Sequence, residues 1–293
     1  MIETIDDLAT KLLRTRSKEA QVDFRPSVRP IYRNSDDHLR PHHVGSCILL
    51  NIDDMPILAT AAHILDNLKA GWTLYVGGQG GGPATRIRAG DIGATPAPNG
   101  DRSLDQFDSG FWRMPDEAVR ELGDVKFIEA SRLSDNREDV SRHYYMVMGY
   151  RLKRNRSAID HKVKLISNHL SQYSGSVSAM PKLAEELNVS GEDHLFMPLP
   201  KYGEDEDGRR INAFGPVGFS GGPLLDLGDF TLMEAFAPGY VHRATLCGMM
   251  IAYYPRHRAM ASLKVGLVVD SVRQLLRPTS RARSWALKGP PRT

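Results

Sequence analysis

The sequence contains little of what marks several large protein classes. Only 2 cysteines occur in 293 residues, too few for a disulfide framework or a four-cysteine zinc site. No apolar run approaches the roughly 18 residues that a membrane helix needs. The start, Met1 to Asp7, lacks the basic residues and the apolar core of a secretory signal. We therefore expect a cytoplasmic protein with no membrane segment, no bound metal and no cofactor, while a single bridge between Cys47 and Cys247 stays open.

Net charge is also small, because 38 Lys and Arg residues face 35 Asp and Glu residues, giving +3. The basic excess lies in residues 277–293, which hold five Lys or Arg residues and no acid. The body of the chain is therefore close to neutral, which excludes nucleic-acid binding by the surface as a whole. Residues 278–293 are expected to form a basic, disordered tail, and contact with nucleic acid or another acidic partner is expected only through it.

The first residues predict an amphipathic helix. Thr4 is suited to cap it, and apolar residues such as Leu8 and Leu12 fall on one face. Residues 19–44 are polar and broken by proline, which is typical of a strap across a surface rather than a core element. We therefore treat residues 1–44 as a helix and a surface strap outside the main domain.

Short apolar runs separated by polar residues predict β-strands from Gly45 onward. The expected strands are 46–52, 55–60, 73–76, 86–88, 110–112, 144–148, 162–166, 222–225, 245–251 and 265–269, with a tight turn at Asp53 and Asp54. Short helices are expected at 116–122 and 181–187, and a last helix from Asp270. Residues 167–212 fit no clear pattern. Many short strands with few helices indicate a sandwich or barrels, and about 225 residues of this pattern suit two small barrels better than one.

The strongest functional signal is the segment Gly218-Phe219-Ser220-Gly221-Gly222-Pro223. A serine between glycines lets the backbone turn sharply, which exposes the hydroxyl and lets a substrate approach closely. The amides of Gly218 and Ser220 can then point into one concavity and stabilise a developing oxyanion. An ordinary glycine-rich turn with an incidental serine is the simpler interpretation, and the sequence does not exclude it.

Two further segments supply the partners that such a serine needs. The apolar strand at 55–59 is followed by small residues that deliver His63 at its end, where an imidazole beside a hydroxyl acts as a general base. Asp108 opens the apolar strand at 110–112, and its carboxylate is suited to hold the other imidazole N–H. Asp105, three residues earlier, competes for that role. Each residue alone has a plainer structural explanation, and the combination favours catalysis.

In the order His63, Asp108, Ser220, the chain resembles the trypsin- or chymotrypsin-like serine endopeptidase family. The matching segments are 60–63, 108–112 and 218–223, and more weakly 145–150 and 265–276. The resemblance covers residues 45–277 and implies a mostly β fold of two six-stranded antiparallel β-barrels, with N- and C-terminal helices. It places the first barrel at about 45–130 and the second at about 131–277, with the catalytic groups in the cleft between them.

The resemblance also implies a role for each matched residue. Ser220 is the nucleophile, His63 the general base and then acid, and Asp108 the orienting carboxylate. The amides of Gly218 and Ser220 form the oxyanion hole. The expected activity is hydrolysis of peptide bonds in a polypeptide substrate through an acyl-enzyme formed on Ser220.

Some residues depart from the family's pattern. Phe219 stands where digestive relatives carry an Asp that pairs with a freshly cut N-terminus, so the chain resembles the bacterial and viral branches instead. Phe214 stands where trypsin-type enzymes carry an acid that selects Lys or Arg. An apolar side chain there disfavours tryptic specificity and favours an apolar or small residue. Phe214, Met250 and Ile251 are the candidate substrate-pocket residues.

Two other functions stay open. The chain could keep the protease fold as a catalytically silent binding or scaffold protein whose cleft is closed. It could instead be an adaptor that docks a partner through its first helix and its basic tail. An intracellular protease must spare its host, so an activating or docking protein partner is a further hypothesis for the catalytic interpretation.

Overall fold

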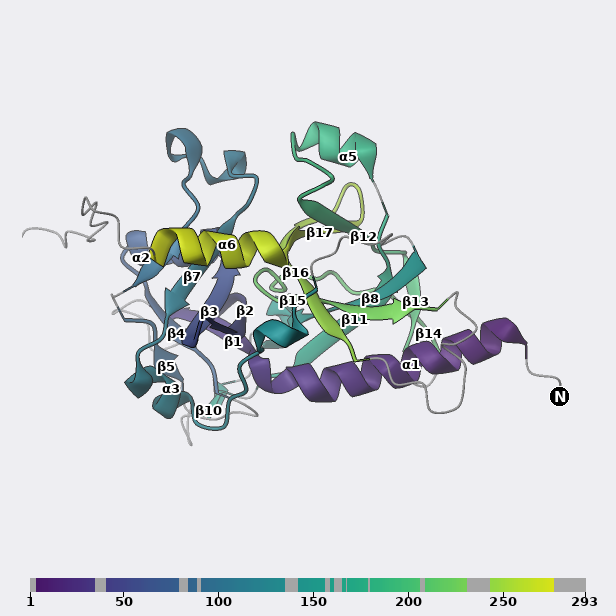
Figure 1. Cartoon of the computed structure of the whole chain (residues 1–293), viewed down its shortest axis with the longest axis horizontal. Helices are drawn as coiled ribbons and strands as arrows, with labels where there is room; N and C mark the ends of the chain where they lie inside the picture. Colours follow the sequence, from purple (N-terminus) through teal and green to yellow (C-terminus); the bar gives the residue numbers. More distant parts are fainter. Residues whose placement is uncertain are drawn as a thin grey trace, which may run out of the picture.

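The computed structural model describes residues 4–34, 41–78, 84–88, 91–134, 142–155, 159–160, 165–166, 168–178, 180–205, 209–230 and 243–276. The tail predicted at 278–293 lies outside these residues. Within them, no helix has both the length and the apolar character that crossing a membrane requires. The fold is mostly β, as the sequence predicts, with a helix near each end of the described chain (Figure 1).

The first sheet has seven antiparallel strands in the order β5-β4-β1-β2-β3-β7-β6. They are β1 (Val28–Asn34), β2 (His42–Ile52), β3 (Met55–Ala61), β4 (Thr73–Val76), β5 (Thr85–Arg86), β6 (Ile92–Ala94) and β7 (Ser109–Arg113). The chain between β2 and β3 turns at Asp53 and Asp54, whose φ angles of 51° and 60° fit the two-residue turn that β-hairpins favour. The tight turn predicted at these aspartates is therefore confirmed.

The second sheet has six antiparallel strands in the order β11-β8-β15-β16-β17-β12. They are β8 (His143–Tyr150), β11 (Leu170–Ser176), β12 (His194–Pro198), β15 (Pro223–Asp229), β16 (Thr245–Tyr254) and β17 (Ala259–Lys264). Two separate ladders pair β9 (Ile159–Asp160) with β10 (Leu165–Ile166) and β13 (Tyr202–Glu204) with β14 (Arg210–Asn212). Each large sheet curls into a half-barrel, and the first has seven strands where six were expected.

Helices connect and flank the sheets. The α-helices are α1 (Ile5–Phe24), α2 (Ala62–Lys69), α3 (Asp116–Leu122), α4 (Leu152–Asn155), α5 (Pro181–Glu186) and α6 (Val265–Leu276), and the short 3₁₀ helices are η1 (Arg25–Ser27), η3 (Pro98–Gly100), η4 (Arg102–Leu104) and η5 (Ala130–Arg132). Thr4 caps α1 as predicted. Its hydroxyl accepts a hydrogen bond from the Asp7 amide at 3.2 Å, and the Asp7 carboxylate accepts one from the Thr4 amide at 3.0 Å.

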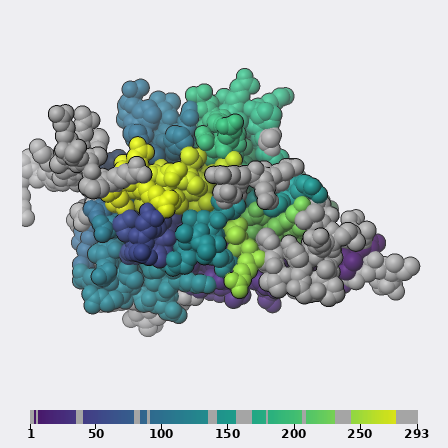
Figure 2. Space-filling view, viewed as in Figure 1, coloured from purple at the N-terminus to yellow at the C-terminus, as the bar shows by residue number. Residues whose placement is uncertain are grey.

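Buried apolar residues form three clusters. One belongs to the first sheet and includes Trp112, and another belongs to the second sheet and includes Phe219. The largest draws on both sheets and on α6, through residues such as Ile48, Met148 and Val268. Helix α6 contacts strands of both sheets, and its yellow surface lies across the visible face in Figure 2. The shared cluster fixes the two sheets relative to each other, and with them the segments at their junction.

The expectation of a surface strap at residues 19–44 is wrong. Helix α1 continues to Phe24, and β1 is an interior strand that pairs with both β2 and β4. The first five residues of β1 are buried, including the charged Arg29, whose guanidinium donates hydrogen bonds to three backbone carbonyl oxygens. The sequence pattern did not reveal this strand because a buried arginine needs hydrogen-bond acceptors, and two of its three acceptors lie outside the strand.

The strand predicted at 265–269 is also wrong, because these residues begin helix α6. The four buried valines of α6 follow the i, i+3, i+4, i+7 spacing of one helix face. The preference of valine for strands therefore suggested the wrong structure. The strand that precedes this helix is β17, which the sequence pattern did not reveal.

Helix α1 packs on the chain's own second sheet (Figure 1). Its Arg14 pairs with Glu204 at 2.8 Å, and the hydroxyl of its Ser17 lies 2.9 Å from the hydroxyl of Ser174 in β11. Part of the first helix, which the sequence left open as a docking element for a partner, is therefore covered by the chain itself.

Candidate active site

The predicted histidine lies at the junction of a strand and a helix. Strand β3 ends at Ala61, α2 begins at Ala62, and His63 is the second residue of the helix. Ala61 and Ala62 are fully buried, whereas 40% of the His63 side chain is exposed. The small neighbours therefore anchor this junction in the core while the imidazole stays accessible.

Asp108 binds His63 through both carboxylate oxygens. Its Oδ2 lies 2.6 Å from Nδ1 of His63, and its Oδ1 accepts a hydrogen bond from the His63 amide at 2.9 Å. The Asp108 carbonyl oxygen also accepts a hydrogen bond from the Ala62 amide at 2.9 Å. Asp108 has a φ of 40°, which is uncommon for a residue with a side chain. These contacts hold the imidazole by Nδ1 and leave Nε2 for proton transfer.

Asp105, the competing candidate, has other partners. Its Oδ2 lies 2.5 Å from the Arg102 guanidinium and 2.5 Å from the Thr95 hydroxyl. Its side chain is nearly buried, with 3% exposed. Asp105 therefore stabilises the loop that precedes Asp108, and it is Asp108 that contacts His63.

The loop that carries Asp108 also contacts the second sheet. The His194 imidazole in β12 is buried, and its Nε2 lies 2.8 Å from the Gln106 carbonyl oxygen. Burial, and then the nearby Asp108 carboxylate, raise the pKa of the Tyr254 hydroxyl in β16. The pair formed by His63 and Asp108 therefore lies where the two sheets meet.

The predicted nucleophile lies in a tight turn that requires glycine on both sides of it. Gly218 and Gly221 have φ angles of 98° and 84°, which residues with a side chain rarely adopt. A Cβ on Gly218 would lie 2.5 Å from the Tyr150 carbonyl oxygen, and a Cβ on Gly221 would overlap the Ser46 carbonyl oxygen. The turn therefore packs directly on β8 of the second sheet and on β2 of the first.

Two backbone amides of this turn remain available to donate a hydrogen bond to a bound group. The amides of Phe219, Gly221 and Gly222 each donate a hydrogen bond to a backbone carbonyl oxygen. In the described part of the chain, the amides of Gly218 and Ser220 donate none. Two neighbouring amides without partners are what the stabilisation of an oxyanion requires.

Ser220 lies close to the segment that carries His63. Its carbonyl oxygen accepts a hydrogen bond from the Ser46 amide at 2.8 Å. A Cβ on Gly45 would lie 3.1 Å from that same oxygen and would overlap the side chain of Ile64. Among the residues that the structure describes, no hydrogen bond joins Ser220 Oγ to His63. Such bonds often tighten only in a substrate complex, so the place of the serine in the triad stays a prediction.

Phe219 anchors the turn in the core of the second sheet. Its ring is fully buried against Gly149, and its centroid lies 5.8 Å from that of Phe214. The Arg151 guanidinium lies 4.2 Å above the Phe214 ring. Apolar packing therefore holds the residue next to Ser220 in place.

The three candidate pocket residues have different surroundings. Phe214 is half-buried, Met250 is buried in the cluster of the second sheet, and Ile251 is buried in the cluster shared by both sheets. The Met250 amide and carbonyl pair with Gly222 and Gly221, so this part of β16 lies directly beside the serine turn. Their role in binding a substrate stays a prediction.

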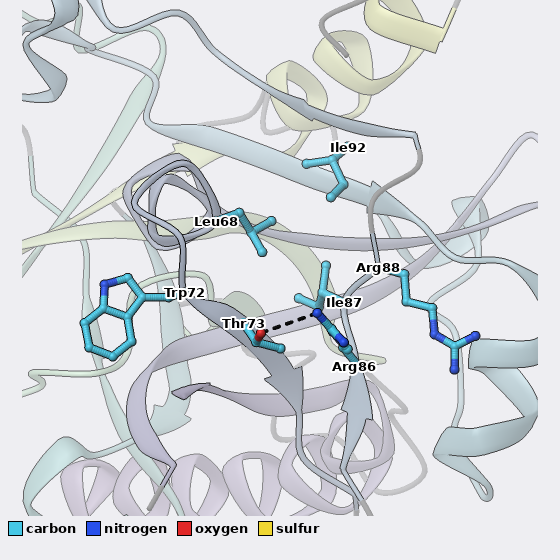
Figure 3. Close-up of a pocket in the computed structure, with 7 residues that line it drawn as sticks. All are labelled: Leu68, Trp72, Thr73, Arg86, Ile87, Arg88 and Ile92. Carbon is cyan, nitrogen blue, oxygen red and sulfur yellow. Dashed lines mark hydrogen bonds between the residues drawn. The ribbon is translucent and has the colours of Figure 1, made fainter. Parts of the chain in front are cut away.

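A cavity of about 320 Å³ lies elsewhere, on the first sheet (Figure 3). Its lining residues are Leu68, Trp72, Thr73, Arg86, Ile87, Arg88 and Ile92. Arg88 pairs with Glu117 and Glu121, each at 3.1 Å. None of the predicted site residues lines this cavity, so it is separate from the candidate active site.

The two cysteines are buried thiols in different sheets, Cys47 in the first and Cys247 in the second. The bridge that the sequence left open is therefore not formed. Burial raises the pKa of the Cys47 thiol to about 12. Among the described residues, no group of three or more His, Cys, Asp or Glu side chains is arranged to hold a metal ion.

Comparisons with known proteins give similar structures but no sequence family. No protein-family model matches the chain, and no curated protein matches it. A Glu endopeptidase in complex with MPD is 14% identical over 85% of this chain and 89% of that chain, with a TM-score of 0.47. The thermostable serine protease AL20 from an extremophilic microorganism is 12% identical over 85% of this chain and 94% of that chain, with a TM-score of 0.49. An inactive mutant form of Rv3671c from M. tuberculosis is 12% identical over 89% of this chain and 92% of that chain, with a TM-score of 0.46. At these identities and scores, the likeness says nothing about the site.

The sequence did not reveal several residues that support the site. The Ser46 hydroxyl contacts Gly218, and the buried His194 contacts Gln106. The partners lie 172 and 88 residues apart in the sequence. No local pattern marks such residues, because their contacts exist only once the two sheets have docked.

Proposed function

We propose that this protein is a serine endopeptidase. Ser220 attacks the carbonyl carbon of a peptide bond, and His63 takes the hydroxyl proton and passes it to the leaving amine. Water, activated by the same imidazole, then hydrolyses the acyl-enzyme and restores the Ser220 hydroxyl. Asp108 holds the imidazole throughout, and the Gly218 and Ser220 amides stabilise the oxyanion of both tetrahedral intermediates.

The observation that supports this proposal most strongly is the contact between His63 and Asp108. The 2.6 Å distance from Oδ2 to Nδ1, together with the second bond to the His63 amide, fixes the ring in one orientation. A carboxylate at Nδ1 favours the tautomer that leaves Nε2 able to accept a proton. The adjacent turn contributes a serine and two amides without partners among the described residues.

Labelling with a fluorophosphonate tests the proposal directly, because the reagent phosphonylates an activated serine whatever the substrate. We expect peptide mapping to find the label on Ser220 of the intact chain. The label should be lost in Ser220→Ala and His63→Ala variants that still melt cooperatively. Ser176→Ala removes an exposed hydroxyl from β11 and should label like the parent. A folded, monodisperse parent chain that takes no label would contradict the proposal.

The proposed substrate is a polypeptide cleaved after an apolar or small residue. Phe214, packed on Phe219 beside the serine turn, offers no negative charge to a Lys or Arg side chain. A cleavage-site profile on a peptide library, with the Ser220→Ala chain as the blank, measures this preference. Cleavage mainly after Lys or Arg would show that another group selects the substrate.

Two observations favour a second function. Within the described residues Ser220 Oγ makes no hydrogen bond to His63, and the side chains of Met250 and Ile251 are buried. A chain fixed in that state, with its cleft closed, would be a catalytically silent binding or scaffold protein. Saturable peptide binding by a folded chain that takes no fluorophosphonate would favour this scaffold function over the endopeptidase.

The proposal includes a cytoplasmic location and control by a protein partner. Two buried thiols without a disulfide are typical of a reducing compartment, and a protease there must be restrained until it is needed. Cell fractionation tests the location. A rise in the rate of fluorophosphonate labelling when a protein that binds the chain is added tests the regulation by a partner.

A further inference from the structure

Ser46 binds the serine turn through both its backbone and its side chain. It is a fully buried residue of β2, in the first sheet. Its amide donates to the Ser220 carbonyl oxygen at 2.8 Å, and its hydroxyl lies 2.9 Å from the Gly218 carbonyl oxygen. The pairing of β2 with β3 begins only at Ile48. The Ser46 amide is therefore able to bind the turn in place of a neighbouring strand.

The partners of the Ser46 hydroxyl fix the direction of both of its hydrogen bonds. The Tyr150 amide, at 2.9 Å, can only donate, so the Ser46 oxygen accepts from it. The Gly218 carbonyl can only accept, so the single hydroxyl proton points toward it. The Thr60 hydroxyl donates to the Ser46 carbonyl oxygen at 2.7 Å and holds the residue from a third side.

These bonds orient the peptide planes around the two available amides. The carbonyl oxygens of Val217, Gly218, Phe219 and Ser220 accept hydrogen bonds from the Leu152 amide, the Ser46 hydroxyl, the Gly222 amide and the Ser46 amide, in that order. Of these four carbonyls, the one held by a side chain belongs to Gly218. The same peptide plane carries the Phe219 amide, which donates to the Pro216 carbonyl oxygen, so removal of the Ser46 hydroxyl takes away one of the two bonds that hold it. This plane lies between the planes of the Gly218 and Ser220 amides, and glycine at 218 gives it more freedom to turn once it is held by one bond alone.

We propose that Ser46 is a positioning residue for the oxyanion hole, which it serves by holding the Gly218 carbonyl so that the Gly218 and Ser220 amides point to where negative charge develops. This inference rests on the proposed endopeptidase function. Preorganised donors act on the transition state more than on the bound ground state. Loss of the hydroxyl therefore lowers the rate of the chemical step and leaves the affinity for the reagent nearly unchanged.

Saturable phosphonylation of Ser220 by a fluorophosphonate separates these two quantities. We expect Ser46→Ala to lower the maximal rate by about ten- to hundredfold with little change in the half-saturating concentration, and Ser46→Thr to recover much of the rate. Cys47→Ala is the matched control: the next residue of β2 is also fully buried, and its thiol donates to the Arg29 carbonyl at 3.4 Å, away from the turn. Equal maximal rates for Ser46→Ala and Cys47→Ala would overturn the inference.

Hydrogen–deuterium exchange keeps this inference distinguishable from the proposed function. Peptides covering residues 216–222 should exchange faster in Ser46→Ala and at the parent rate in Cys47→Ala, and unchanged exchange in both would overturn the positioning role. A parent chain that takes no label would refute the endopeptidase function, and with it the role of Ser46 in catalysis. If Ser46→Ala does not fold, Thr60→Val, which releases the Ser46 carbonyl, takes its place. We expect this variant to show a smaller loss of the maximal labelling rate and a smaller rise in exchange at residues 216–222. A labelling rate and an exchange rate equal to those of the parent would overturn the inference.

Discussion

Acid should destabilise this protein through a histidine that takes no part in the proposed chemistry. His43 lies in β2 with 3% of its surface exposed, and its ring meets Tyr32 edge-on at 5.5 Å. Burial lowers the pKa of His43 to about 4, against a smaller opposing effect of the Gly45 backbone. In the unfolded chain, the same imidazole has an ordinary pKa of about 6.5. The folded protein therefore resists a proton that the unfolded chain accepts.

The sign and the size of the effect follow from this difference. Because the folded pKa lies below the unfolded one, the contribution of His43 to stability is complete above about pH 6.5 and is lost as the pH falls toward about 4. Each pH unit in this window costs about 1.4 kcal/mol. Acidification from about pH 6.5 to about pH 5 therefore removes about 2 kcal/mol from the free energy of unfolding through His43 alone.

Urea unfolding of the parent and of His43→Gln, measured from about pH 7 to about pH 5, tests this. Glutamine does not titrate, so the variant should lose about 2 kcal/mol less than the parent over that range. Any fixed cost of the substitution cancels, because the comparison is between pH slopes. His257→Gln, at a more exposed histidine paired with Glu186, should keep most of the parent slope. Identical slopes for the parent and His43→Gln would refute the reasoning.

Substitutions at the candidate site have equally definite outcomes. Asp108→Asn should slow fluorophosphonate labelling by about 10⁴-fold without unfolding the chain, because an amide cannot hold the imidazole of His63 in the same tautomer; a rate near the parent's would deny the carboxylate that role. Gly221→Ala should abolish labelling and lower the melting temperature in calorimetry, because its Cβ would overlap the Ser46 carbonyl at a φ of 84°. Phe219→Ala should lower the free energy of unfolding in urea by about 3–5 kcal/mol, and a loss below about 1 kcal/mol would show that the ring does not anchor the turn.

Apolar runs closed by turn residues predicted many of the strands within one or two residues. Elements such as β4 and α3 have the predicted bounds because their local sequence carries all of the signal. Strand β1 was missed for a different reason: its buried Arg29 donates to the carbonyl oxygens of Arg25 and Asp124, which lie outside the strand and which the strand pattern does not record. Strand β17 was missed because its alanines, serine and methionine carry little strand preference, and its burial depends on the strands on either side.

For the site, the sequence supplied the residue types but could not choose among their contacts. Two aspartates were candidates for His63, and the choice depends on Arg102, whose guanidinium binds Asp105. The sequence also marked the glycines around Ser220 as a turn. The groups that hold that turn, such as the Ser46 hydroxyl, are ordinary residues of a distant strand.

The position of the candidate site explains why its supporting contacts are non-local. The serine turn is held by the Ser46 amide from the first sheet and by pairing with Met250 from the second. The loop that ends at Asp108 meets the buried His194 of the second sheet. Each half-barrel alone therefore has only part of the framework. The imidazole and its carboxylate are joined within the first half-barrel, whereas the turn has its full set of bonds only when the shared core has formed. Partial unfolding that separates the sheets must remove these contacts even if each sheet keeps its strands, because the bonds that orient the turn cross the junction.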